Sequence, residues 1–457
     1  MNYNISVSEF LQRSESGGID YGDFMVAFRE ELSSWKKHNF LRIETDMNCA
    51  PKEGLFGLPV SVKDCICTKG IESCAGSRIL KGYVPPFDAT SVRRIKDDGG
   101  NIIGKTNQDE FGFGTFSTNS GYGIPRNPHD MERTCGGSSG GSGGLTAALK
   151  MPHISLAEST GGSITAPAAF CGVVGLTPTY GLVSRYGLID YANSLDKIGV
   201  ISRTVRDAAL MLSIIAGHDE RDMTSLPMQR MNYTRHIDEG AKGLSIGVPK
   251  EYFHNVDDAI EKDVWSAIKK LESEGATYKE ISLPHTKYSL AAYYIIATSE
   301  ASTNLAKYCG MRYGIHSKLE GNFNEYFSEV RTEGFGDEAK RRIILGTFAR
   351  MSGYRDQYYM KAMKIRTLVI EDFKKAFRGV DVIAAPSMPV MPPRFSEIEK
   401  LTPSQQYQMD VLTVPSNLAG IPAITVPCGK MTGLHILGNH LHEGTVIRAA
   451  SAYEVIR

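Results

Sequence analysis

Hydrophobic residues recur with two different periods along this chain, and the two periods alternate. In residues 24–35 they fall three and four positions apart, as on one face of a helix, and residues 1–45 are predicted to be helical. Short apolar runs at 57–66 and 101–106 are typical of buried strands. Residues 91–100, between these runs, are predicted to form a helix that ends at two glycines.

The alternation continues toward the C-terminus. A strand over 243–250, a helix over 257–276 and a strand over 277–284 form a predicted βαβ unit. A long helix is predicted over 288–308, and two late strands are predicted over 380–387 and 422–429. Strands that alternate with helices indicate an α/β protein, with a mostly parallel or mixed β-sheet core covered by helices on both faces.

Residues 134–144, TCGGSSGGSGG, interrupt these regular patterns. A glycine and serine run is by itself typical of a flexible linker, because glycine removes the steric limits that order a backbone. Both flanks carry α/β patterns, however, with a helix predicted over 143–150 and a strand over 153–159. A flexible spacer inside a continuous fold costs conformational entropy without a gain. Two other interpretations of the run therefore remain, a phosphate-binding loop and a catalytic segment.

Composition places the chain among globular proteins and excludes some functions. Its 457 residues are 42% hydrophobic and 22% charged. The chain has 51 Lys and Arg residues and 51 Asp and Glu residues, so its formal net charge is zero. This balance argues against a protein whose main function is to bind nucleic acid. No apolar stretch approaches the ~20 residues needed to span a membrane, and no signal peptide is recognised. The eight cysteines form no CxxC pair, so free thiols in a reducing cytoplasm are expected.

Two motifs suggest other functions, and their context argues against both. Residues 99–106, GGNIIGKT, match the phosphate-binding loop pattern, but that loop must follow a strand, and a helix is predicted here instead. His435, His440 and His442 could suggest a metal site. His440 and His442 point to opposite faces if the chain is extended, and no Cys or Asp accompanies them, so no metal is expected.

Residues 159–172, STGGSITAPAAFCG, form a second glycine turn, which is predicted to open a helix. Ser163 has the setting of a nucleophile there, because glycine N–H groups at a helix N-terminus favour a developing oxyanion. No histidine falls in a comparable motif nearby, so the other candidate base is a lysine kept neutral by burial. Lys63, on a predicted buried strand, is the best candidate, although a strand-end lysine that reaches solvent is the preferred interpretation when this residue is taken alone.

Three separated motifs, in this order, resemble those of the amidase-signature hydrolases, which use a Ser–cisSer–Lys triad. They are the lysine of GLPVSVKD, the serine pair of GGSSGG and the serine of TGGSI. Within that family, the chain resembles the A subunits of glutamyl-tRNA(Gln) amidotransferases in residues 82–92, 104–114, 178–203, 333–354 and 410–429. The resemblance implies an N-terminal helical segment over 1–48 and a single amidase-signature domain over 49–457.

The resemblance also implies a role for each matching residue. Ser163 is the acylated nucleophile, Ser138 the cis-peptide serine that relays the proton, and Lys63 the base. The implied oxyanion hole comprises Thr160, Gly161, Gly162 and Ser163. The implied glutamine-binding residues are Arg342 and Asp410, which can pair with the opposite charges of a free amino acid, and Tyr293 at the edge of the pocket.

The chain departs from the family pattern at three points. The interval between Ser138 and Ser163 is 163 − 138 = 25, one residue longer than the family pattern. Ser159 stands where the family usually has Asp, and Thr165 where it usually has Arg. Our hypothesis is that the usual Asp and Arg pair with each other and were replaced together.

The function implied by the resemblance is that of a cytoplasmic glutaminase subunit, which supplies ammonia for the amidation of Glu-tRNA(Gln), Asp-tRNA(Asn) or both. The implied partners are glutamine, the B and C subunits of the amidotransferase, and a misacylated tRNA bound mainly through a partner. No cofactor is expected in this subunit, because ATP and Mg²⁺ are used by the partner, and no membrane is expected. The alternatives are a stand-alone amidase for small amides and a catalytically inactive scaffold.

Overall fold

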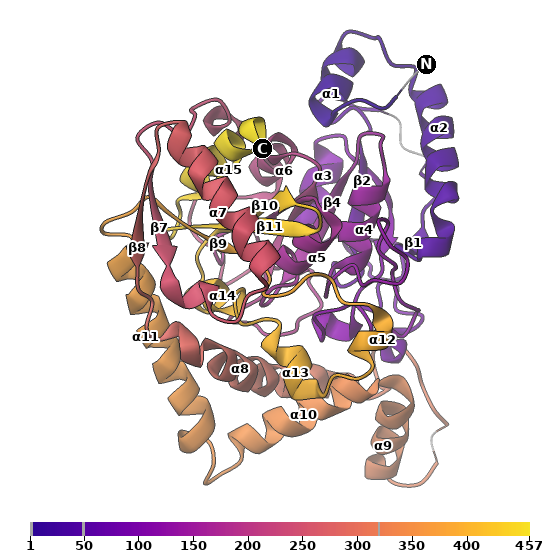
Figure 1. The fold of residues 1–457 in the computed structure, drawn as a ribbon. Coiled ribbons are helices and arrows are strands. Elements are labelled where there is room, and N and C mark those ends of the chain that lie inside the picture. Colours follow the sequence, from indigo (N-terminus) through magenta and orange to yellow (C-terminus); the bar gives the residue numbers. More distant parts are fainter. Residues whose placement is uncertain (1–2, 48–50, 319) are drawn as a thin grey trace.

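The computed structural model describes residues 3–47, 51–318 and 320–457, and one β-sheet runs through it (Figure 1). In the described residues this sheet has eleven strands, in the order β1-β3-β2-β4-β6-β5-β10-β11-β9-β7-β8. The strands are β1 Leu41–Glu44, β2 Pro59–Lys63, β3 Asn101–Thr106, β4 Ile154–Ser159, β5 Val174–Thr177, β6 Lys197–Ser202, β7 Ser245–Pro249, β8 Thr277–Ile281, β9 Val382–Pro386, β10 Ala423–Gly429 and β11 Thr432–Gly438.

The sheet contains parallel and antiparallel pairs. Strand β2 lies between β3 and β4 and is parallel to both, so the carboxyl ends of these three strands meet at one edge. Strand β7 is parallel to β8 and β9. The central strands β6, β5, β10 and β11 run antiparallel to their sheet neighbours. The prediction of an α/β fold with a mixed sheet is confirmed.

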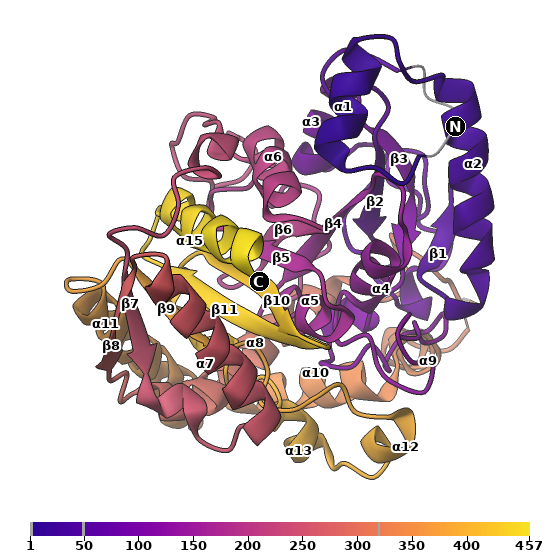
Figure 2. The ribbon, with the colours of Figure 1, turned by 45° about the horizontal axis from the view of Figure 1, so that its top comes forward.

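Helices cover both faces of the sheet (Figure 2). Gly433 and Gly438 are five residues apart in β11 and therefore face opposite sides. A Cβ on Gly433 would lie 3.1 Å from Ala169 of α5, and one on Gly438 would lie 2.3 Å from Val446 of α15. The helices are α1 Val7–Glu15, α2 Tyr21–Ser34, α3 Thr90–Asp97, α4 Gly140–Ala148, α5 Thr165–Cys171, α6 Val205–Ile215, α7 Asp258–Ser273, α8 Ser289–Asn304, α9 Phe323–Gly334, α10 Asp337–Arg350, α11 Lys361–Ala376, α12 Phe395–Ile398, α13 Pro403–Gln408, α14 Val414–Ala419 and α15 Glu443–Ile456.

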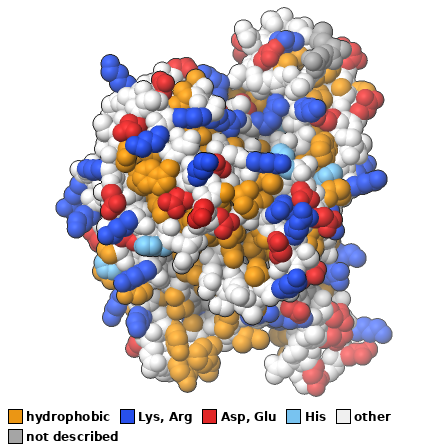
Figure 3. Space-filling view, viewed as in Figure 1, with side chains coloured by type: hydrophobic (Ala, Val, Ile, Leu, Met, Phe, Trp, Pro, Cys, Tyr) orange, Lys and Arg blue, Asp and Glu red, His pale blue; other side chains and the backbone are white. Residues whose placement is uncertain are grey.

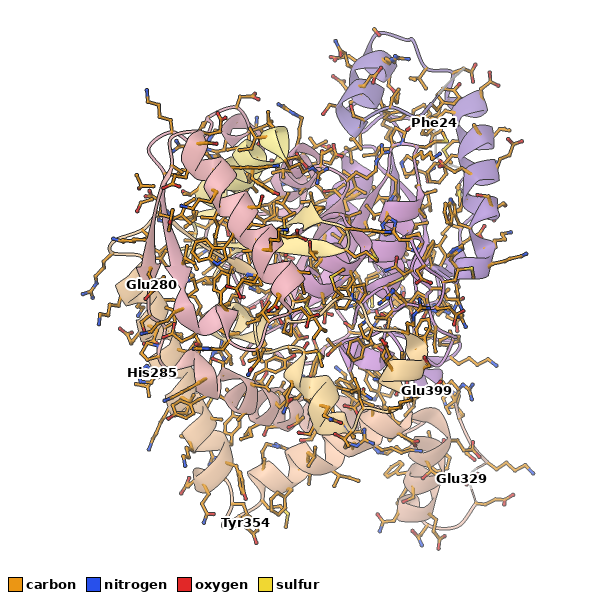
Figure 4. The ribbon with its side chains drawn as sticks, viewed as in Figure 1. Phe24, Glu280, His285, Glu329, Tyr354 and Glu399 are labelled. Atoms are coloured by element: carbon orange, nitrogen blue, oxygen red, sulfur yellow. The ribbon has the colours of Figure 1, made fainter. Side chains whose placement is uncertain are left out.

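The N-terminal helices α1 and α2 lie at the β1 edge of the sheet (Figures 1 and 4). Phe24 of α2 packs against the ring of Phe10 of α1, with ring centroids 4.7 Å apart, and both side chains are fully buried. The helical prediction for residues 1–45 is wrong for Leu41–Glu44, which form β1. These residues pair antiparallel with β3, because that strand offers them unpaired backbone groups at the sheet edge.

Other local predictions agree with the structure to within a few residues. The predicted βαβ unit is observed as β7, α7 and β8, and residues 101–106 form the buried strand β3 rather than a phosphate-binding loop. Lys105 within that strand is fully buried, and its Nζ donates to Thr68 Oγ1 at 3.2 Å and to Ser73 Oγ at 3.0 Å. Strands β5, β6 and β11 were not predicted.

The region where α10 leads into α11 exposes apolar side chains. A π-helical turn, η8 (Asp356–Met360), joins the two helices. The exposed apolar residues here include Ile344, Leu345, Phe348, Met351 and Tyr354. We call these five residues the α10 patch. Hydrophobic side chains gather at the lower end of the molecule in Figure 3, and Figure 4, in the same view, labels Tyr354 there. No helix among the described residues combines the length and the apolar character needed to cross a membrane.

Candidate active site

Lys63 is the last residue of β2, and the parallel pairing of β2 with β4 brings it beside Glu158. The Lys63 side chain is fully buried, so it does not reach solvent. Its Nζ donates to Ser138 Oγ at 2.7 Å, to the Glu158 backbone oxygen at 2.9 Å and to Glu158 Oε2 at 2.9 Å. The lysine predicted as a base is therefore in direct contact with the serine predicted as its relay.

The glycine and serine run that carries Ser138 is packed into the interior. Ser138 is fully buried, and the peptide bond between Gly137 and Ser138 is cis. A Cβ on Gly137 would lie 2.3 Å from Asp109 Oδ2, and one on Gly141 would lie 2.4 Å from the Phe40 backbone oxygen. Glycine is needed at these positions because no side chain fits, so the run is not a flexible linker.

Ser163 lies in the turn between β4 and α5 and is 6% exposed. The Ser139 N–H donates to the Ser163 backbone oxygen at 3.3 Å, which joins this turn to the glycine and serine run. Two glycines of the turn also admit no side chain: a Cβ on Gly161 would lie 2.8 Å from Tyr293 Oη, and one on Gly162 would lie 2.4 Å from Thr413 Oγ1.

The predicted oxyanion hole is only partly free of internal hydrogen bonds. The Ser163 N–H donates to Ser159 Oγ at 3.0 Å, and Ser159 Oγ donates to the Gly161 backbone oxygen at 3.2 Å. Among the described residues, the N–H groups of Thr160, Gly161 and Gly162 have no acceptor. Of the four predicted oxyanion-hole residues, these three have N–H groups that are free to donate to an oxyanion.

Behind Lys63 lies a buried acidic network. Glu158 is 3% exposed, and its Oε1 lies 2.8 Å from Thr160 Oγ1, which in turn lies 2.9 Å from Asp196 Oδ1. Burial and the neighbouring Glu158 carboxylate raise the pKa of Asp196 well above its ordinary value. Glu158 was not among the predicted site residues. The signal that could have identified it is a carboxylate within the otherwise uncharged strand segment directly before TGGS.

Arg342 and Asp410, predicted to bind glutamine, are both buried and meet around Tyr294. The Arg342 guanidinium lies 5.2 Å from the centre of the Tyr294 ring, and Tyr294 Oη donates to Asp410 Oδ2 at 2.6 Å. Arg342 Nε donates to Glu338 Oε1 at 2.8 Å. Burial raises the pKa of Asp410 from its ordinary value, and the hydrogen bonds from Tyr294 and Thr115 act in the opposite direction.

The three histidines considered as metal ligands are not brought together. His435 is buried in β11, whereas His440 and His442 follow the end of that strand. Within residues 3–47, 51–318 and 320–457, no group of three or more His, Cys, Asp or Glu side chains is placed to hold a metal ion.

The sequence model of a single family, described as Amidase, matches residues 6–447. This chain belongs to the Amidase family. The chain is 51% identical over 405 residues to the A subunit of the glutamyl-tRNA(Gln) amidotransferase of Methanococcoides burtonii. The matched residues are 88% of this chain and 84% of that subunit. The protein of the same name from Persephonella marina is 44% identical over 456 residues, or 99% of this chain and 93% of that protein.

Solved structures of the Amidase family share the fold. The A subunit of the glutamyl-tRNA(Gln) amidotransferase from Thermotoga maritima has a TM-score of 0.83 and is 36% identical, covering 99% of this chain and 95% of that one. A bacterial aryl acylamidase of the amidase signature family has a TM-score of 0.84 at 23% identity, covering 99% of this chain and 96% of that one, which shows the fold alone.

Proposed function

We propose that this chain is the glutaminase subunit of a tRNA-dependent amidotransferase. In this role it hydrolyses glutamine to glutamate and ammonia, and the ammonia amidates Glu-tRNA(Gln), Asp-tRNA(Asn) or both. The observation that carries the proposal is the fully buried contact between Lys63 Nζ and Ser138 Oγ at 2.7 Å, beside the Ser163 turn. The identity of 51% to a relative named as the A subunit of such an enzyme supports the choice of substrate.

In the proposed mechanism, Ser163 Oγ attacks the side-chain amide carbon of glutamine. Its proton passes to Ser138, and Lys63 accepts the proton of Ser138, since Lys63 Nζ already touches that hydroxyl. The N–H groups of Gly161 and Gly162 stabilise the oxyanion, with Thr160 and Ser163 completing the turn that holds them. The proton returns along the same path to the leaving ammonia, and water then hydrolyses the glutamyl ester.

Glutamine recognition is assigned to Arg342, Asp410 and Tyr293. Among the described residues, Arg342 Nη2 has no hydrogen-bond acceptor, so it can bind the carboxylate of glutamine, and Asp410 can bind the amino group. Tyr293 is 3% exposed, and its hydroxyl lies 2.8 Å from the position that a Cβ on Gly161 would take, which supports a role beside the Ser163 turn.

The proposed partners are the B and C subunits, with the misacylated tRNA bound mainly through a partner in the cytoplasm. We assign no cofactor to this subunit; the partner that activates the tRNA-bound carboxylate uses ATP and Mg²⁺. A net charge of zero fits a subunit that leaves tRNA binding to its partner. The α10 patch supports a subunit role, because contiguous exposed apolar residues are typical of protein contact surfaces.

Glutamate release from glutamine, measured with and without the partner subunits, tests this function. Wild type is expected to release glutamate, whereas Ser163→Ala and Lys63→Ala are expected to lose at least about 10³-fold in kcat, because each removes a group that acts as part of one unit. Thr413→Ser is a matched control that alters a neighbouring hydroxyl residue and retains its oxygen.

Full glutaminase activity in Ser163→Ala would contradict the assignment of the nucleophile. Copurification with two further subunits separates an amidotransferase subunit from a stand-alone amidase, which would purify alone and hydrolyse small amides. If no amide is hydrolysed with any partner present, the remaining interpretation is that the chain is a catalytically inactive scaffold.

A further inference from the structure

Three acceptors surround Lys63 Nζ, at 2.7, 2.9 and 2.9 Å. An ammonium group has three hydrogens, so all three acceptors are satisfied when Lys63 is charged. One of the acceptors is the Glu158 carboxylate, and the side chains of this ion pair are 0% and 4% exposed. Lys63 and Glu158 therefore form a buried pair whose combined charge is zero when both are ionised.

A neutral lysine beside an ionised Glu158 would leave one buried negative charge without a counter-ion. An unpaired charge in a protein interior is strongly unfavourable. Lys63 can become neutral without this penalty only if Glu158 takes up the proton that Lys63 releases. The charge of the buried pair is then zero before and after the transfer.

The residues behind Glu158 hold its second oxygen. Thr160 Oγ1 lies within hydrogen-bond distance of both Glu158 Oε1 and Asp196 Oδ1, but its hydroxyl has a single hydrogen to donate. Asp196 already accepts hydrogen bonds from the N–H groups of Tyr191 and Ala192, so the Thr160 hydrogen is available to Glu158 Oε1. This hydrogen bond holds the carboxylate with Oε2 toward Lys63.

We propose that Glu158 is the final proton acceptor of the amide-hydrolysis relay, which runs from Ser163 through Ser138 and Lys63. This inference rests on the proposed function, which supplies the nucleophile and the relay. Glu158 does not touch the substrate; it is a positioning residue that acts through Lys63. Any amide that acylates Ser163 would use this relay.

The transfer balances as follows. Lys63 passes one proton to Glu158 Oε2, which gives a neutral amine and a neutral acid. Ser163 Oγ forms a bond to the amide carbon and gives its proton to Ser138, whose own proton goes to the Lys63 amine. The products are an oxyanion, a Lys63 ammonium and a protonated Glu158. When the C–N bond breaks, the proton on Glu158 returns through Lys63 and Ser138 to the departing ammonia.

Other titratable groups surround this pair. They are Asp109, whose pKa is raised to about 6 by burial, the Cys65 thiol, whose pKa burial raises, and Asp196. Asp109 accepts hydrogen bonds from the N–H groups of Ser117 and Asn119. All three remain in a Glu158 variant, so a difference between that variant and wild type reports on Glu158.

The acid limb of the pH profile of kcat/KM distinguishes this relay from a simple ion pair. In the relay, wild-type Lys63 becomes neutral by passing its proton to Glu158, and no proton has to leave the pair for solvent. In Glu158→Gln the lysine must be neutral by itself, so the acid limb is expected to move to higher pH by about one unit or more. Activity at pH 7 is expected to fall about 10²-fold and to recover as the pH rises.

If Glu158 were only a counter-ion that keeps Lys63 charged, its removal would move the acid limb to lower pH. A purely structural role would leave the limb where it is. Either result overturns the proposal. Glu443→Gln is the matched control: Glu443 is buried, 1% exposed, and accepts from the Thr179 N–H at 2.8 Å, whereas the hydrogen-bond partners of Lys63 are Ser138 and Glu158. Its acid limb is expected to match wild type.

A second variant covers the case in which Glu158→Gln does not fold. Thr160→Val removes the hydrogen bond to Glu158 Oε1 that holds Oε2 toward Lys63, so the transfer from Lys63 to Glu158 is weakened and the acid limb is expected to move the same way by a smaller amount. An unshifted or lowered limb in this folded variant overturns the relay.

The profiles are recorded with glutamine and with propionamide. Hydrolysis of propionamide without hydrolysis of glutamine contradicts the glutaminase function, and the relay is then tested on propionamide. Hydrolysis of glutamine with the limb shifted the wrong way contradicts the relay alone.

Discussion

At the scale of single residues, the turn around Ser163 shows how few side chains this part of the molecule admits. Ser159 is fully buried and its hydroxyl bridges the Ser163 N–H and the Gly161 oxygen, while Thr165 is 4% exposed at the start of α5. Both positions carry small hydroxyl residues where the family resemblance implies Asp and Arg. A buried charge without its partner is strongly destabilising, which is why these two positions are expected to vary together.

The double variant Ser159→Asp, Thr165→Arg is therefore expected to be more stable and more active than either single variant. Each single change buries one unpaired charge, with an expected cost of roughly 3–5 kcal/mol. Urea unfolding and glutamate release on all three variants measure the coupling between the two positions. Single variants that equal the double variant in stability and activity would show that the positions are independent.

At the scale of elements, the strands that hold the core bury several basic side chains. His435, in the middle of β11, is 1% exposed, and burial together with the charge of Lys197 lowers its pKa to about 3. At pH values below 6.5, the ordinary pKa of histidine, His435 binds a proton in the unfolded chain but not in the folded chain. The contribution of His435 to stability therefore decreases as the pH falls from 6.5 toward 3.

His435→Leu is expected to reduce this acid sensitivity. At pH 5, about 1.5 units below the pKa of His435 in the unfolded chain, keeping His435 neutral in the folded chain lowers the free energy of unfolding by about 2 kcal/mol. Between pH 7.5 and pH 5, the free energy of unfolding of the variant should therefore fall by about 2 kcal/mol less than that of wild type. Free energies of unfolding in urea at both pH values measure the difference. His440→Leu, at an exposed position, is the control. The same pH dependence in His435→Leu and wild type would contradict the argument.

At the scale of the whole molecule, the N-terminal segment and the rest of the chain share one sheet. Strand β1 pairs with β3, and helix α2 contacts the body through Tyr21, whose Oη donates to the Gly57 oxygen at 3.0 Å, and Glu31, which accepts from the Lys150 N–H at 2.7 Å. The boundary between residues 48 and 49 stays a prediction, because residues 48–50 lie outside the described residues.

A chain of residues 49–457 is expected to be less stable than the full chain and prone to association. Its truncation uncovers the β3 edge and the surface under α1 and α2, and an exposed edge strand pairs readily with other chains. Size-exclusion chromatography and thermal unfolding of both chains test this. An equally stable, monomeric 49–457 would show that this part folds independently.

Much of the fold and site could be predicted from local sequence. The spacing of apolar residues predicted β7, α7 and β8, because period and length are local properties of a strand or helix. The motifs containing Lys63, Ser138 and Ser163 predicted residues that the structure brings together, because Lys63 contacts Ser138 and the Ser163 turn is bonded to Ser139. Strand β1 was predicted as helix, because its pairing with β3 depends on a partner 60 residues away.

The sequence by itself determined the α/β class, the positions of most elements and the residue types of the proposed triad. Only the tertiary structure decided that Lys63 is fully buried against Ser138 and that Glu158 completes a charge-neutral pair. Lys63 and Glu158 are 95 residues apart, and they meet because β2 and β4 are parallel neighbours that end at the same edge. Sequence periodicity reports which face of an element is buried, but the partner of a buried charge depends on which strands lie side by side.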